Sequence, residues 1–134
     1  MKSTKPNILY CLLILLLVAG SSLVIAAEPT RITGSVYCDH NQNGQFDHKE
    51  KGLKNIHVQI FAGQCGGNAL QMIHTDEDGN FTFQGFDAGT YFVRADVACV
   101  CGGRMPTTTS CQKVVLSAGE AIELPPFGYS EYGQ

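Results

Sequence analysis

Oxygen-bearing side chains follow one another within residues 39–50 at the spacing of a calcium-binding loop. Calcium is a hard cation that binds about six to eight oxygen atoms, so a short loop must turn tightly and direct alternate side chains inward. Gly44 stands at the sixth position, where a residue without a Cβ allows a sharp turn. The alternative is a polar turn without a metal, because Asn, Asp and Gly are common in turns of every kind. The predicted ligands are the side chains of Asp39, Asn41, Asn43, Asp47 and Glu50 and the backbone carbonyl of Gln45.

The segments on both sides of this loop alternate in the manner of β-strands. Residues 31–38 place apolar side chains at every second position on one face, and residues 52–61 end in the same pattern. A helix–loop–helix calcium sensor would need amphipathic helices in both places, so the sequence excludes that class of protein. The predicted ion would therefore hold together the connection between two strands.

The remainder of the chain is also predicted to form strands. Turn signals rich in Gly and Asp separate short alternating segments, and no convincing helix follows the N-terminal region. About seven short strands with frequent turns predict an all-β fold, an antiparallel β-sandwich. The further strands are expected within residues 71–75, 81–83, 90–97, 113–116 and 121–124, and the predicted core includes Phe81, Phe83, Phe86, Tyr91, Val93 and Phe127.

The N-terminal region is predicted to be a hydrophobic leader. Two lysines precede an apolar run over residues 8–18, and small residues follow as far as Ala27, where cleavage is plausible. We therefore expect a signal peptide over residues 1–27 and one domain over residues 28–134. The alternative is a retained membrane anchor, because an apolar helix of this length could span about 30 Å of hydrocarbon.

The predicted domain is acidic. Residues 28–134 contain seven Lys and Arg and twelve Asp and Glu, a formal net charge of −5. An acidic surface argues against nucleic acid and against anionic lipid as partners, and it suits a cation-binding protein. The four histidines, His40, His48, His57 and His74, are all predicted to face solvent.

Five cysteines remain after the leader: Cys38, Cys65, Cys99, Cys101 and Cys111. In a small exported domain they predict two disulfides, with one thiol left over or paired to another chain. Cys99 and Cys101 are too close together in a strand to bond each other, so each is expected to take a separate partner, with Cys65 and Cys111 as the candidates. A soft-metal site made of Cys99, Cys101 and Cys111 is an alternative, although the Cys-x-x-Cys spacing of ordinary zinc sites is absent.

A series of motifs occurs in an order that resembles a known family. The motifs are Val36-Tyr37, the loop 39–50, Gly52-Leu53, Thr-Asp-Glu-Asp-Gly-Asn-Phe at 75–81, Gly85-Phe86, Ala-Gly-Thr-Tyr at 88–91 and Pro-Phe-Gly-Tyr at 126–129. In this order the chain resembles, from residue 32 to residue 129, the B-type domains of serine–aspartate repeat surface proteins (SdrD B-like domains), which are related to collagen-adhesin B-type domains. The resemblance implies an immunoglobulin-like or prealbumin-like sandwich that needs calcium for rigidity and stands at the cell surface. It also implies weaker calcium sites near Asp76 and Asp78, for which the alternative is an acidic hairpin turn.

These observations together predict a non-enzymatic, exported calcium-binding module. Calcium would rigidify a spacer or an adhesive unit that is secreted or held at the cell surface, with the periplasm as another location. The expected partner is a surface protein or a glycan, and after leader cleavage no membrane contact is expected. The alternative function is a carbohydrate- or peptide-binding accessory module of a secreted assembly. An enzyme is disfavoured because the sequence shows no paired catalytic carboxylates, nucleophile elbow or phosphate loop.

Overall fold

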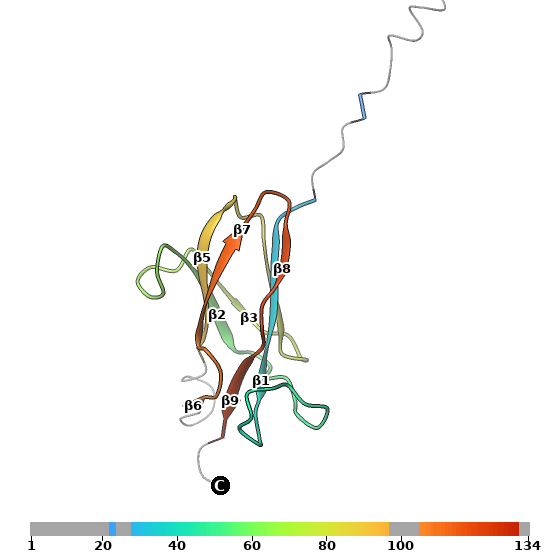
Figure 1. Ribbon diagram of the computed structural model, residues 1–134, viewed down its shortest axis with the longest axis vertical. Helices are drawn as coiled ribbons and strands as arrows, with labels where there is room; N and C mark the ends of the chain where they lie inside the picture. The colour runs from blue at the N-terminus through green and yellow to red at the C-terminus, as the bar shows by residue number, and fades with distance from the viewer. Residues whose placement is uncertain (1–21, 24–27, 97–104, 132–134) are drawn as a thin grey trace, which may run out of the picture.

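The computed structural model describes residues 22–23, 28–96 and 105–131, and these residues form a sandwich of two β-sheets (Figure 1). Within them the secondary structure consists of strands, as the all-β prediction requires. The strands are β1 (Arg31–Cys38), β2 (His57–Ala62), β3 (Gln71–His74), β4 (Asn80–Gln84), β5 (Gly89–Asp96), β6 (Met105–Pro106), β7 (Cys111–Leu116), β8 (Ala121–Glu123) and β9 (Phe127–Ser130).

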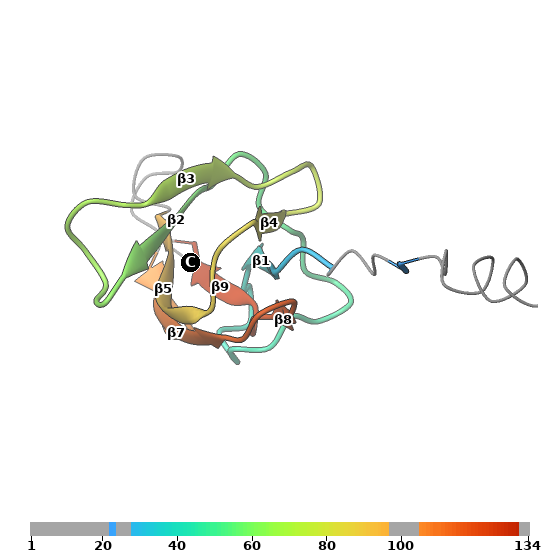
Figure 2. The same cartoon turned by 90° about the horizontal axis from the view of Figure 1, so that it is seen from above.

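The two sheets face each other across the core (Figure 2). One has the order β4-β1-β9-β6, with β8 also paired to β1, and the other has the order β3-β2-β5-β7. The sandwich is confirmed, but its pairing is not antiparallel throughout, because β8 and β9 both run parallel to β1. Pro125 and Pro126 lie between β8 and β9 and carry no backbone N–H, so the chain cannot continue one hydrogen-bonded strand along β1.

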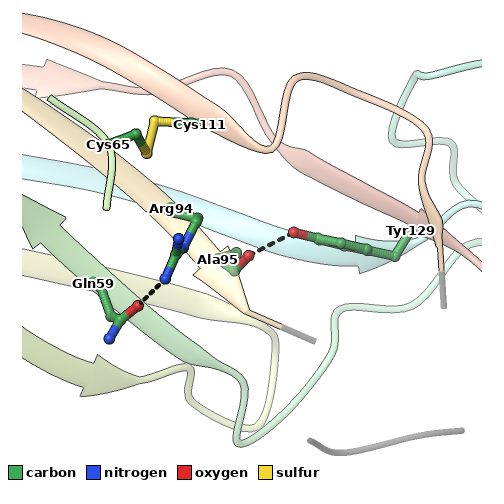
Figure 3. Close-up of a disulfide and its surroundings, with 6 residues drawn as sticks. All are labelled: Gln59, Cys65, Arg94, Ala95, Cys111 and Tyr129. Carbon is green, nitrogen blue, oxygen red and sulfur yellow. Dashed lines mark hydrogen bonds between the residues drawn. A yellow bond between two sulfur atoms is a disulfide. The ribbon is translucent and has the colours of Figure 1, made fainter. Parts of the chain in front are cut away.

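The core confirms the aromatic prediction. Phe81, Phe83, Val93 and Phe127 are buried, and the partly buried Phe86 and Tyr91 pack against them. Each large side chain removed from water contributes about 1.5–3 kcal/mol, so this cluster supplies much of the drive to fold. The hydroxyl of Tyr129 in β9 adds a polar link between the sheets by donating to the carbonyl of Ala95 in β5, at 2.7 Å (Figure 3).

Two aromatic side chains depart from simple alternation. Tyr37 follows the buried Val36 in β1, so alternation places it on the opposite face of the strand, yet it is fully buried. Phe61 points to the outer side of the four-stranded sheet, opposite Phe92, and is only 1% exposed. The Arg94 guanidinium lies 5.2 Å from the centroid of its ring and covers it from outside. The Arg94 side chain therefore shields part of the outer face of this sheet from solvent.

Several sequence predictions fall outside the described part of the chain. They concern most of the leader over residues 1–27, and also Cys99 and Cys101. Among the described residues, no helix has both the length and the apolar character needed to cross a membrane.

Candidate metal centre

The predicted calcium loop connects β1 to β2 and starts from a buried charge. Asp39 follows β1 directly and is 0% exposed. Its backbone N–H donates to the Tyr129 carbonyl at 2.9 Å, so the start of the loop is fixed to β9. Its carboxylate accepts hydrogen bonds from the backbone N–H groups of Asn43, at 3.2 Å, and of Gly44, at 2.8 Å. Gly44 has a φ of +74°, which explains the need for glycine at this turn.

The two asparagines wind the middle of the loop. Asn41 Oδ1 accepts the backbone N–H of Asn43 at 3.1 Å, and Asn43 Oδ1 accepts that of Gln45 at 2.8 Å. The two amide Nδ2 groups both donate to the same oxygen, Asp47 Oδ2, at 2.9 Å. Each amide oxygen has a second lone pair, so these turns leave it able to bind a cation.

Glu50 closes the loop from its far end. Its Oε1 accepts the backbone N–H of His40 at 3.0 Å, and its Oε2 accepts that of Asp47 at 3.0 Å. The last predicted ligand therefore reaches back to the residue after the first one. The structure thus draws together the five predicted side-chain ligands by hydrogen bonds within one loop.

The electrostatics of the loop show a concentration of negative charge. Burial raises the pKa of Asp39, but the Thr107 hydroxyl and the loop N–H groups outweigh burial and leave this pKa below its usual value. The amides of Asn41 and Asn43 lower the pKa of Asp47. Burial first, and then the charges of Asp39, Glu50 and Asp47, raise the pKa of Tyr37 to about 12. Three carboxylates therefore act on one phenol.

Two buried hydroxyl groups lie beside this charge, and that of Thr107 is a group that lowers the pKa of Asp39. They are Tyr37 OH and Thr107 Oγ1. A Cβ added at Gly128 would stand 2.6 Å from Thr107 Oγ1 and 2.7 Å from Tyr37 OH, so β9 must have a small residue here. The Tyr37 ring stacks on Phe46 of the loop, with 4.6 Å between ring centroids.

The residues present fit calcium by their chemistry. The donors are carboxylate and amide oxygens, which a hard cation prefers. The buried Tyr37 hydroxyl beside them makes no hydrogen bond among the described residues. Among the described residues, no three His, Cys, Asp or Glu side chains already converge in the geometry of a metal site. Binding would therefore need the carboxylates of Asp39 and Glu50 to move from backbone N–H groups, and that of Asp47 from the asparagine amides, toward the ion.

The weaker candidates lie in the turn between β3 and β4. Asp76 Oδ1 accepts the backbone N–H groups of Asp78 and Asn80, each at 2.9 Å, and so stabilises the turn. Asp78 lines a cleft of about 530 Å³ together with Phe46 and Glu50 of the loop. The two acidic segments therefore face one shared opening, and the weaker calcium sites stay a prediction.

Sequence reasoning missed the residues that support the loop from other strands. Alternation along β1 gives no reason to expect Tyr37 to be buried, and Thr107 and Gly128 lie far from the loop in sequence. Thr107 N–H donates to the Gly128 carbonyl at 2.8 Å, and Gly128 N–H donates to Thr108 Oγ1 at 2.9 Å. Within the loop itself, Phe46 was the residue that could have indicated this packing, because an aromatic side chain in a polar loop needs a packing partner.

The cysteine pairing differs from the prediction. Cys65 bonds Cys111, 46 residues later, so neither can be the partner of Cys99 or Cys101 (Figure 3). Cys111 stands opposite Arg94 in the pairing of β7 with β5, and this position brings it to the loop that contains Cys65. The disulfide also removes Cys111 from the proposed soft-metal site. Cys38 is buried, with its Sγ 3.9 Å from His40 Nδ1.

Comparison with known proteins identifies related sequences. The model of the SdrD B-like domain family matches residues 30–116. The chain is 36% identical over 75 residues to serine-aspartate repeat-containing protein F of Staphylococcus epidermidis, a match that covers 55% of this chain and 4% of that protein. It is 35% identical over 75 residues to serine-aspartate repeat-containing protein C of Staphylococcus aureus, covering 56% and 7%. The chain thus spans less than a tenth of these relatives.

Solved structures share the fold at low sequence identity. The minor pilin of Streptococcus agalactiae has a TM-score of 0.56 at 9% identity, over 80% of this chain and 46% of the pilin. The major plantain pollen allergen Pla l 1 has a TM-score of 0.57 at 14% identity, over 79% of this chain and 96% of the allergen. These similarities establish the sandwich architecture alone.

Proposed function

We propose, from the fact that this chain belongs to the SdrD B-like domain family, that it is a non-enzymatic, exported module which calcium makes rigid. In this proposal it serves as a spacer or adhesive unit at the cell surface, with a surface protein or a glycan as partner. The chain's short match to much longer repeat-containing relatives suits a module of this kind.

The observation that carries the proposal is the group of three carboxylates in the loop between β1 and β2. Asp39, Asp47 and Glu50 are positioned by backbone and amide donors, and all three influence the phenol of Tyr37. The three negative charges belong to one short loop, and bound calcium would supply the positive charge to complement them. Their arrangement therefore favours a divalent cation over an empty turn.

The loop is well placed to control rigidity. Asp39 is bonded to β9, and Leu53, just after the loop, donates its N–H to the Val36 carbonyl at 2.8 Å. Both ends of the loop are thus attached to the sheet, and fixing Asp39 relative to Glu50 would also fix the start of β2 relative to β1. The chain enters and leaves the sandwich at opposite ends of its long axis, as a spacer requires (Figure 1).

The expected stabilisation follows from binding to the folded state. It equals RT ln(1 + [Ca²⁺]/Kd), about 2.7 kcal/mol when calcium exceeds Kd a hundredfold. Extracellular modules bind calcium with Kd values of about 10⁻⁴–10⁻³ M, so external calcium could determine the stability of the loop.

Calorimetric titration and thermal melting of the purified protein test this proposal. We expect one calcium-binding event with a Kd of about 10⁻⁴–10⁻³ M and a higher melting temperature in calcium than in chelator. Asp39→Ala and Glu50→Ala should abolish both effects, whereas Asp87→Ala, at an exposed corner between β4 and β5, should leave them unchanged. Equal melting temperatures in calcium and chelator, with no heat of binding at millimolar calcium, would remove the ion from the proposal.

A further inference from the structure

We propose that His57 and His74 form a second cation site, specific for divalent transition metals and above all for copper(II). This pair lies on the outer side of the four-stranded sheet and shares no residue with the calcium loop. The sequence predicted both residues to face solvent. In the structure His74 is exposed and His57 is half-buried beside it.

The two imidazole rings lie side by side on neighbouring strands. His57 of β2 stands directly opposite His74 of β3 in the antiparallel register. Their ring centroids are 4.4 Å apart, and the ring planes are at 89°. For two imidazole nitrogens bound at about 2.0–2.1 Å with a right angle at the ion, the centroids would stand about 4.5 Å apart. The observed spacing therefore suits one ion shared by both rings.

Two further side chains stand near the pair on the same face of the sheet. Asp96 of β5 stands opposite His57 on its other side, so His74, His57 and Asp96 occupy one row across three strands. Met72 precedes His74 by two residues on β3, faces the same side and is 50% exposed. Since no three His, Cys, Asp or Glu side chains of the described residues converge on one point, the two imidazoles are the primary ligands and water completes the shell.

The guanidinium of Arg94 lies on the same face of the sheet, but it contacts residues other than the two histidines. Arg94 follows in the next row of the same face, where its Nη2 donates to Gln59 Oε1 at 2.8 Å (Figure 3). Its guanidinium also stacks over Phe61. These two contacts orient the cation along β2, so it does not occupy the space between the histidine rings.

The donor set distinguishes this site from the loop. Imidazole nitrogens bind copper, nickel and zinc, whereas calcium takes oxygen ligands. Among divalent ions of the first transition series, copper(II) binds a given nitrogen site most tightly. The pair should therefore bind copper(II) in the presence of excess calcium.

Titration of the full chain with copper(II) chloride in saturating calcium tests the proposal, read by calorimetry and by electron paramagnetic resonance. We expect one copper(II) per chain with two nitrogen ligands in the spectrum. His57→Gln and His74→Gln should each weaken binding at least tenfold and remove one nitrogen from the spectrum. His48→Gln, an exposed histidine of the calcium loop, should change neither.

A second measurement keeps the result independent of folding defects in the variants. Copper(II) broadens the nuclear magnetic resonance signals of nearby residues, so the wild-type protein should lose signals in β2, β3 and the end of β5 first. Broadening confined to the calcium loop or to the chain terminus, or unchanged copper affinity in both histidine variants, would overturn the proposal.

Discussion

Removing the disulfide between Cys65 and Cys111 should destabilise the domain strongly. The bond closes a segment with a sequence separation of 46 residues. The loop-closure entropy of an unfolded chain of that length corresponds to about 4 kcal/mol at 25 °C. For a domain of about 100 residues, this equals a fall in melting temperature of roughly 15–30 °C. The double variant Cys65→Ser, Cys111→Ser should show a loss of this size.

The assay is equilibrium unfolding in urea, followed by circular dichroism, at one fixed calcium concentration. A shift of the midpoint without a change in slope would identify a change in stability alone. Gln64→Ser is the matched control, because it alters an exposed side chain of the same loop without touching the bond. Mass spectrometry of the unreduced wild type should recover Cys65 and Cys111 in one linked peptide. Equal midpoints for the double variant and the wild type would refute the entropic reasoning.

Three further predictions concern the core, the loop and the outer face. Gly34→Ala should cost about 1–3 kcal/mol in urea unfolding, because the new Cβ would stand 2.5 Å from Cζ of the Phe81 ring. The pKa of Asp39 is lower in the folded state than its ordinary value of 3.8, so its ionised form stabilises the fold. In chelator, lowering the pH below 3.8 should progressively remove this stability. Asp39→Asn should flatten this part of the pH–stability curve. Arg94→Ala should cost about 1 kcal/mol, because it uncovers Phe61 and removes a cation–π contact, and a thermal melt measures the loss.

Matched variants separate these effects from general damage. Gly89→Ala should be tolerated far better than Gly34→Ala, since its Cβ would meet only the Tyr91 side chain at 3.6 Å. Lys113→Ala removes an exposed cation from the same face as Arg94 and should change the melting temperature little. A Gly89→Ala variant as unstable as Gly34→Ala would contradict the packing explanation.

The sequence predicts well those features that depend on neighbouring residues. The first strand has the expected bounds, Arg31–Cys38, because its alternation and the polar loop after it are both local signals. The hydrogen-bonded loop after it was likewise predictable, since its polar residues and Gly44 all lie within residues 39–50. By contrast, β6 has only two residues, one of them Pro106, and exists because β9 lies beside it. No local pattern could have indicated it.

The missed features all depend on long-range contacts. Tyr37 is buried because Phe46 stacks on it and Gly128 lets β9 approach its hydroxyl. The bond of Cys65 to Cys111 depends on the register of β7 against β5, which places Cys111 beside Arg94. Alternation along a strand also cannot show that Phe61 is covered from outside, because the covering residue belongs to the neighbouring strand.

The parallel pairing of β1 with β8 and β9 has a mechanical consequence. β1 is the first strand and β9 the last, and the chain leaves the sandwich at opposite ends (Figure 1). A pull on the two ends would slide β1 along its parallel neighbours and load their hydrogen bonds simultaneously, in shear. Unzipping a hairpin, in contrast, breaks such bonds one after another. The arrangement therefore resists tension along the long axis, the direction in which a tethered spacer is stretched.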